Sequence, residues 1–183
     1  MQQVTVQGKT FGQFISHEQI HQRIAELGAQ ITREYVGKDP LFLGVLNGSF
    51  LFAADLLKEV PIPCQISFVK LASYSGTQSS GTVNTLLGLT ESLLNRHVIV
   101  LEDIIDTGLT LHKLLELVNT LQPASVKVAA LLNKPTARKV DVPTHYIGFD
   151  TPDDFLLGYG LDLDGYGRNL KHIYKLQNSN SYA

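Results

Sequence analysis

The sequence has a single cysteine, Cys64, and no tryptophan. One cysteine excludes an intramolecular disulfide, and the apolar, proline-rich surroundings of Cys64 are typical of an inert thiol rather than a nucleophile. No apolar run approaches the roughly 20 residues that cross a bilayer, and residues 1–7 lack the charged and then apolar order of a signal peptide. We therefore expect a cytoplasmic protein that forms no disulfide and enters no membrane.

An excess of basic charge is also missing. The chain has 15 Lys and Arg residues against 17 Asp and Glu residues, a formal net charge of -2 and a pI near 6.3. This balance argues against a nucleic-acid partner, which would require a basic face. The length of 183 residues is enough to bury a substantial core. We expect one domain spanning residues 1–183, without internal repeats.

Apolar periodicity predicts that strands alternate with helices. Ser16 and Gln19 have the spacing of a capping box, and a helical stripe of apolar residues follows from Ile20 to Tyr35. Such alternation favours right-handed crossovers, so we expect a three-layer α/β domain with a mainly parallel central sheet. Short apolar runs predict strands at 41–46, 66–71, 98–101, 126–132 and 146–149, with further helices at 50–57 and 111–118.

The most informative segment is 98–110. A β-branched run is followed by the adjacent carboxylates Glu102 and Asp103, a third carboxylate at Asp106 and a Thr-Gly-x-Thr turn, after which a helical pattern begins. Ligands bind at this carboxyl end of parallel strands, and the free N–H groups of a helix N-terminus hold phosphate. Because the lysine of a GxxxxGKS or GxxxxGKT loop is missing, a monophosphate is favoured over a triphosphate. The anion-binding candidates are Thr107, Gly108 and Thr110.

The neighbouring carboxylates indicate more specifically which kind of ligand binds here. Glu102 and Asp103 repel each other unless hydroxyls or a cation offset their charges, and a vicinal sugar diol or a hydrated Mg²⁺ would do so. The alternative is that both residues cap the next helix or face solvent. The Thr-Gly-x-Thr turn directly downstream favours ligand binding over these alternatives. A site for sugar hydroxyls beside a site for phosphate indicates that the ligand is a sugar phosphate.

This arrangement resembles the phosphoribosyl-diphosphate signature of the type I phosphoribosyltransferases, and the flanking sequence from about Leu41 to Lys171 is similar to their hypoxanthine-guanine branch. The resemblance implies their fold, in which chain-terminal segments form a small hood beside the central sheet. It also implies that Glu102 and Asp103 hold the ribose hydroxyls, directly or through Mg²⁺, and that Asp106 is the general base beside the purine. The implied contacts to the rest of the sugar phosphate are Ile105, Thr107, Gly108, Leu109 and Thr110, with Leu109 replacing a common lysine.

The resemblance assigns pyrophosphate binding to a second turn. Leu46, Asn47 and Gly48 follow a predicted strand, which fits an anion site but equally a plain Asn-Gly turn. In the family this turn contains a non-proline cis peptide before a residue that is commonly lysine, so only the backbone role is carried over to Asn47. Arg168 would be a further pyrophosphate contact, although a lone arginine is more often a solvated charge.

The remaining implied contacts concern the purine, the metal and a loop. Lys134 would donate to the 6-oxo group of the purine, although a surface lysine is the default. Phe155 would stack on the purine, unless it is a core residue, and the backbone of Leu156 would read its edge. Asp162 would be the second Mg²⁺ ligand. The polar run 73–82 resembles the family's catalytic lid, with Ser73 and Tyr74 at its hinge, and a floppy hairpin loop is the alternative.

One motif indicates a different chemistry. Residues 17–21 satisfy HExxH, the pattern of zinc proteases. A catalytic zinc also needs a third protein ligand, and Glu34 lies too far along the same predicted helix to share a metal with His21. Both His17 and His21 flank the apolar stripe, where partly buried histidines are common. We interpret the motif as part of the helix packing.

The sequence therefore predicts a Mg²⁺-dependent purine phosphoribosyltransferase. Such an enzyme would join hypoxanthine or guanine to 5-phosphoribosyl 1-diphosphate in purine salvage, giving IMP or GMP and pyrophosphate. It would be a homodimer or a homotetramer. The alternative is a regulator of the same fold that senses phosphoribosyl diphosphate and binds RNA or DNA. A regulator would be expected to carry a basic face, and the charge balance argues against one.

Overall fold

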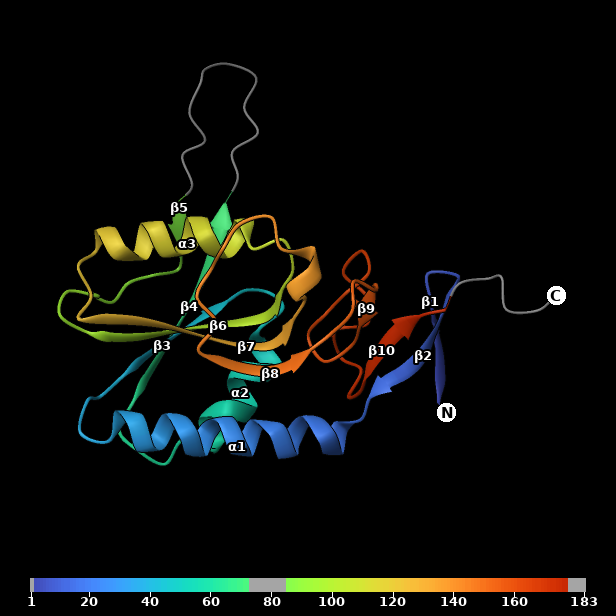
Figure 1. Ribbon diagram of the computed structural model, residues 1–183, viewed down its shortest axis with the longest axis horizontal. Helices are drawn as coiled ribbons and strands as arrows, with labels where there is room; N and C mark the ends of the chain where they lie inside the picture. The colour runs from blue at the N-terminus through green and yellow to red at the C-terminus, as the bar shows by residue number, and fades with distance from the viewer. Residues whose placement is uncertain (1, 73–84, 178–183) are drawn as a thin grey trace, which may run out of the picture.

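The computed structural model describes residues 2–72 and 85–177. Its centre is a six-stranded sheet with the order β5-β4-β3-β6-β7-β8 (Figure 1). Neighbouring strands are parallel from β4 through β8, and only β5 is antiparallel, pairing with β4. The predicted mainly parallel sheet is confirmed. Its strands are β3 (Leu41–Val45), β4 (Gln65–Ala72), β5 (Thr85–Leu87), β6 (His97–Ile105), β7 (Ser125–Asn133) and β8 (Tyr146–Asp150).

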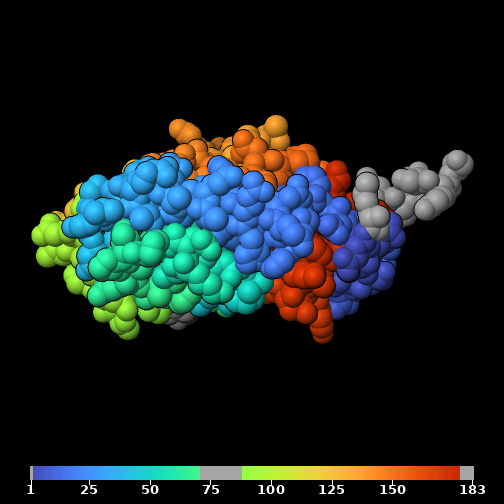
Figure 2. All heavy atoms as spheres, turned by 90° about the horizontal axis from the view of Figure 1, so that it is seen from below, coloured from blue at the N-terminus to red at the C-terminus, as the bar shows by residue number. Residues whose placement is uncertain are grey.

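Helices cover both faces of this sheet, which confirms the three-layer arrangement. The helices α1 (His17–Tyr35) and α2 (Phe50–Lys58) cover one face, and α3 (Leu109–Thr120) covers the other (Figure 1). Figure 2 shows α1 and α2 side by side along their face, where they contact each other. The predicted capping box of Ser16 and Gln19 is present at the start of α1. The whole predicted stripe of α1 is buried: Ile20, Ile24, Leu27, Ile31 and Tyr35.

The two ends of the chain meet in a second, smaller sheet of four antiparallel strands, with the order β1-β2-β10-β9. Phe11, Leu157 and Tyr174 form its buried cluster. None of these four strands was predicted individually, although the resemblance implies a hood built from chain-terminal segments. The strands are β1 (Gln3–Val6), β2 (Lys9–Ile15), β9 (Leu156–Leu157) and β10 (Ile173–Leu176).

The topology brings three connections to one edge of the central sheet. The strands β3, β6 and β7 are parallel neighbours, so the residues after their carboxyl ends lie close together. These residues are the turn 46–49, the loop 106–108 and Lys134, which precedes the short helix η1 (Pro135–Ala137). Within the described residues, no helix has the length and apolar character needed to cross a membrane.

Candidate active site

The loop after β6 has the geometry of an anion site. Gly108 is the N-cap of α3 and has a φ of 81°, a left-handed conformation that strains other residues. The carbonyl of Thr107 accepts hydrogen bonds from Lys139 N (3.0 Å) and Val140 N (3.4 Å), which fix the loop from outside. The Leu109 N–H donates to Thr107 Oγ1 at 3.4 Å, whereas the next two N–H groups of α3, those of Thr110 and Leu111, have no partner within the helix. These groups, with the exposed Leu109 and Thr110 side chains beside them, lie where an anion could bind.

The acidic pair lies within the strand rather than after it. We expected the strand to end at Leu101, but β6 continues to Ile105 because its pairing with β7 continues to the end of both strands. Glu102 is only 6% exposed, and burial raises its pKa well above the ordinary value, with a smaller contribution from the charge of Asp103. Burial likewise raises the pKa of Asp103, partly offset by the hydrogen bond from Ile104 N to Oδ1 (2.9 Å). Burial therefore disfavours the charged form of both carboxyls.

The turn after β3 packs directly against Asp103. A Cβ atom at Gly48 would collide with the Asp103 carboxylate, so any larger residue here would force that carboxylate to move. The peptide bond between Leu46 and Asn47 is cis, as the resemblance implied. Gly160 in turn packs against Gly48, since an added Cβ there would meet the carbonyl of Gly48. The turn after β3 is therefore packed between the Asp103 carboxylate and Gly160.

The segment that includes Gly160 also brings Arg168 and Asp162 to the site. Arg168 Nη1 donates to the Gly160 carbonyl at 2.7 Å, and Arg168 Nη2 pairs with Asp162 Oδ1 at 2.7 Å. The positive charge of Arg168 lowers the pKa of Asp103, and the negative charge of Asp162 raises it. The Arg168 side chain is 26% exposed, so it is not a free solvated charge.

Lys134 forms the other half of the site. It is 7% exposed, which contradicts the default of a surface lysine. Its backbone N–H donates to the Ile105 carbonyl at 2.9 Å, and its ammonium lies 3.6 Å from Asp106 Oδ2 and 3.5 Å from Asp153 Oδ1. A nearly buried ammonium held between two carboxylates can donate a directed hydrogen bond to a ligand.

Two hydrophobic candidates follow Asp153 in the chain. Phe155 is 45% exposed, so it is not a core residue, and its ring lies 6.2 Å from that of Phe11 between centroids. Leu156 is buried at the start of β9, where its backbone is held by pairing with β10. The second sheet therefore supports a half-exposed aromatic ring two residues after Asp153, the partner of Lys134.

Three contributors were not predicted from the sequence. Asp153 and Gly160 lie in irregular segments that have no periodic signal, and only the structure places them at the site. Arg138 follows Lys134 by four residues, and nothing in the sequence assigns it a role. Its Nη2 donates to Asn133 Oδ1 (2.5 Å) and its Nη1 to the Val142 carbonyl (3.3 Å), so it braces the segment that supports the loop after β6.

The HExxH motif lies at the start of α1. The rings of His17 and His21 are 4.1 Å apart between centroids, and His21 Nε2 lies 3.5 Å from Asp55 Oδ2. The backbone N–H of His17 donates to His172 Nδ1 at 2.8 Å. In residues 2–72 and 85–177, no group of three or more His, Cys, Asp or Glu side chains is arranged to hold a metal ion. The motif therefore packs α1 against its neighbours, as we interpreted it.

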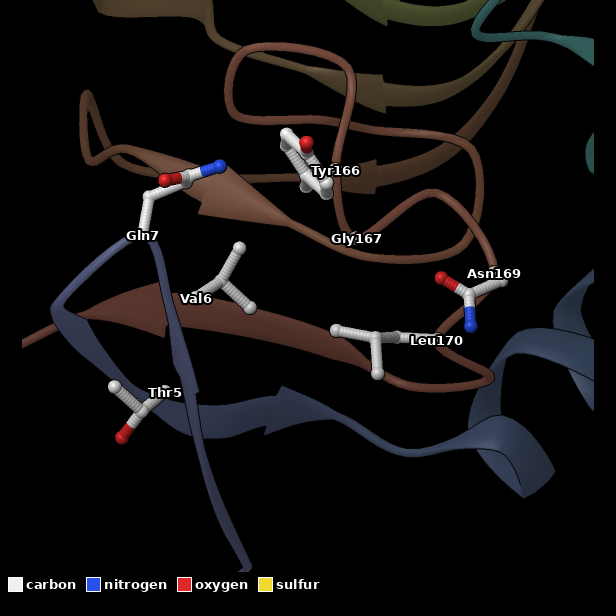
Figure 3. A pocket seen from close by; sticks show the side chains of 7 residues that line it. All are labelled: Thr5, Val6, Gln7, Tyr166, Gly167, Asn169 and Leu170. Atoms are coloured by element: carbon white, nitrogen blue, oxygen red, sulfur yellow. The ribbon is translucent and has the colours of Figure 1, made fainter.

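A pocket of about 300 Å³ lies between the β1–β2 hairpin and the segment 166–170 (Figure 3). It contains none of the predicted site residues and no charged side chain, so it lacks the groups that a phosphate or a magnesium ion requires. The candidate active site remains the edge formed by β3, β6 and β7. The predicted hinge residues Ser73 and Tyr74, like the rest of the segment 73–82, lie outside the described residues.

Comparisons with known proteins agree with this geometry. A profile of the phosphoribosyl transferase domain matches residues 12–164. The chain is 42% identical over 166 residues to a hypoxanthine phosphoribosyltransferase of Haemophilus influenzae, covering 88% of this chain and 93% of that protein. It is also 42% identical over 160 residues to a hypoxanthine-guanine phosphoribosyltransferase of Bacillus subtilis, covering 87% and 89%.

Solved structures show the same relationship. A hypoxanthine phosphoribosyltransferase of Staphylococcus aureus superposes with a TM-score of 0.84 at 36% identity, covering 91% of both chains. A hypoxanthine-guanine phosphoribosyltransferase of Bacillus anthracis gives a TM-score of 0.82 at 38% identity, covering 90% of this chain and 96% of that one. Sequence, fold and site geometry agree, and the chain belongs to the phosphoribosyltransferase family.

Proposed function

We propose that this phosphoribosyltransferase serves purine salvage by joining hypoxanthine, guanine or both to 5-phosphoribosyl 1-diphosphate, which gives IMP or GMP and pyrophosphate. The observation that carries this proposal is the nearly buried Lys134, whose ammonium lies between Asp106 and Asp153 at the edge that also holds the loop after β6. An ammonium in this position could donate a hydrogen bond to the oxo group of a purine base. The names of the relatives, hypoxanthine and hypoxanthine-guanine phosphoribosyltransferases, support the same choice.

The sugar phosphate would bind along the carboxyl end of β6. The N–H groups and hydroxyls of residues 107–110 would hold the 5′-phosphate, with backbone donors substituting for the lysine that Leu109 replaces. Glu102 and Asp103 would accept hydrogen bonds from the ribose hydroxyls, and Ile105 would line the sugar site. The pyrophosphate would meet the turn of Leu46, Asn47 and Gly48 on one side and Arg168 on the other.

The base would lie between the strand edge and the second sheet, which would act as the hood. Lys134 would donate to the 6-oxo group. Phe155, which directly precedes β9, would stack on the purine ring, with the backbone of Leu156 at the edge of the purine. Asp106, which is 49% exposed at its side chain, can reach a ligand. It would take the proton from the imidazole-side nitrogen as the new bond to the ribose carbon forms.

The donor set fits Mg²⁺. Glu102, Asp103 and Asp162 offer the hard oxygen ligands that this ion prefers, and Asp162 lies beside Arg168 on the pyrophosphate side. Since the described carboxylates do not form a ready group of three ligands, the substrate's own oxygens would complete the coordination, as is usual for Mg²⁺. Bound Mg²⁺ would supply charge neutralisation to the leaving pyrophosphate.

We further propose a cytoplasmic homodimer or homotetramer composed of single domains spanning residues 1–183. The substrates and products of the reaction are multiply charged and cross membranes poorly, which supports a location where phosphoribosyl diphosphate is made. The alternative, a regulator that senses phosphoribosyl diphosphate, is not favoured: the relatives are named as enzymes, and a net charge of -2 offers no basic footprint for RNA or DNA.

The experiment is an incubation of the purified protein with phosphoribosyl diphosphate and Mg²⁺ and, in separate reactions, hypoxanthine, guanine, xanthine or adenine. Chromatography would identify the nucleotide formed. We expect IMP, GMP or both, and little AMP. A folded protein that bound phosphoribosyl diphosphate but formed no nucleotide with any purine would support the regulator instead.

A further inference from the structure

The ammonium of Lys134 has two carboxylate partners that come from different parts of the chain. Asp106 follows β6, whereas Asp153 lies in the loop between β8 and β9. The two distances from Lys134 Nζ are nearly equal, 3.6 Å to Asp106 Oδ2 and 3.5 Å to Asp153 Oδ1. The lysine side chain is 9% exposed, but that of Asp153 is 65% exposed. A largely solvated carboxylate thus anchors a largely buried ammonium.

The proposed reaction gives Asp106 a second task, because this carboxylate must turn toward the purine to take its proton. A nearly buried ammonium that lost its only counter-charge at that moment would carry an uncompensated desolvation cost. With Asp153 in place, Lys134 keeps one carboxylate partner while it donates to the 6-oxo group. Asp106 can then take the proton from the purine while Asp153 stays paired with the Lys134 ammonium.

We propose that Asp153 is a positioning residue for purine recognition: it holds the Lys134 ammonium at the base pocket so that Asp106 is free to act on the purine. This inference rests on the proposed function and extends it to a residue that touches neither the sugar nor the phosphate. Asp153 acts only through Lys134. Its loss therefore weakens binding of the base but not of phosphoribosyl diphosphate.

The test compares Asp153→Asn with the neighbouring variant Asp154→Asn. Asp154 is a matched control, since its Oδ2 pairs with Lys175 Nζ at 2.7 Å rather than with Lys134. We expect Asp153→Asn to raise the KM for hypoxanthine about three- to tenfold, the range of a partly screened ion pair. The KM for phosphoribosyl diphosphate should stay within twofold of wild type, and Asp154→Asn should change neither value by more than twofold.

A second measurement asks whether Asp153 acts through Lys134. Equilibrium binding of IMP, whose base carries the 6-oxo group, is measured for wild type, Asp153→Asn, Lys134→Gln and the double variant. Glutamine keeps an N–H donor but has no charge for Asp153 to hold, so adding Asp153→Asn to Lys134→Gln should weaken IMP binding by less than twofold. A full additional loss in the double variant would overturn the inference.

The outcomes separate this inference from the proposed function. Wild-type turnover of hypoxanthine combined with an unchanged KM in a folded Asp153→Asn protein would overturn the role of Asp153 alone. Equal rises in the KM values for hypoxanthine and phosphoribosyl diphosphate would do the same, because they would indicate a general disturbance of the site. No turnover of any purine by the wild type would overturn the proposed function, and the role of Asp153 with it.

Discussion

Replacing Lys134 by methionine tests the base-recognition half of the site. Methionine has a similar length and fills the buried space of a side chain that is 9% exposed, but it cannot donate a hydrogen bond. A hydrogen bond from a charged donor contributes about 1.5 to 3 kcal/mol. Since 1.4 kcal/mol corresponds to a factor of ten, kcat/KM for hypoxanthine should fall roughly 10- to 150-fold.

The same substitution should also change the choice of base. A 6-amino group cannot accept the lysine's hydrogen bond, and a buried polar partner left unsatisfied can give about 10⁴-fold rejection in the wild type. In Lys134→Met this penalty disappears, so the ratio of kcat/KM for hypoxanthine over adenine should fall at least tenfold. Initial rates with both bases at saturating phosphoribosyl diphosphate give this ratio directly. An unchanged ratio, or wild-type turnover of adenine within tenfold of hypoxanthine, would refute the assignment of Lys134.

Three further predictions concern the carboxylates. Asp106→Asn keeps the shape of the loop but removes the proton acceptor, so kcat should fall about 10²- to 10⁴-fold with little change in the affinity for phosphoribosyl diphosphate, measured by titration calorimetry. The double variant Glu102→Gln with Asp103→Asn should instead weaken binding of Mg²⁺-phosphoribosyl diphosphate; equal losses of binding in this variant and Asp106→Asn would contradict the division of roles. Hydrogen bonds from Lys127 and Tyr146 lower the pKa of Glu34 to about 2 from an ordinary 4.5. The stabilisation of the fold by ionised Glu34 is therefore fully present above pH 4.5 and is lost as the pH falls toward 2. With a side chain that is 35% exposed and therefore partly screened, Glu34→Gln should lower the free energy of unfolding by about 1 kcal/mol at pH 7 and by clearly less at pH 3, measured by urea denaturation.

The central sheet and its covering helices were predictable because each strand and helix has a strong apolar pattern in its own local sequence. The stripe of α1 repeats at helical spacing and is buried throughout. The strand prediction at 41–46 differs from β3 by one residue at one end, and that at 126–132 differs from β7 by one residue at each end. The second sheet was not predictable in the same way. β9 has only two residues and exists because Leu157 pairs with Tyr174, which is a contact between distant parts of the chain.

The candidate site likewise combines features that a local pattern predicts with features that depend on contacts between distant residues. The phosphate loop and the acidic pair were located from a contiguous motif, although β6 extends past Glu102 because pairing with β7 outweighs the poor strand propensity of its acidic residues. Lys134 is buried, and its ammonium pairs with Asp106 and Asp153, which lie in other segments of the chain. No local pattern predicts that a lysine after a strand will be enclosed in this way.

The most direct test of the central claim follows pyrophosphate and nucleotide together. The wild-type protein is mixed with phosphoribosyl diphosphate and Mg²⁺, and both products are quantified before and after hypoxanthine is added. Transfer to the base predicts that pyrophosphate and IMP appear in equal amounts and only when hypoxanthine is present. Pyrophosphate released without the base, or binding of phosphoribosyl diphosphate with no IMP formed, would contradict it.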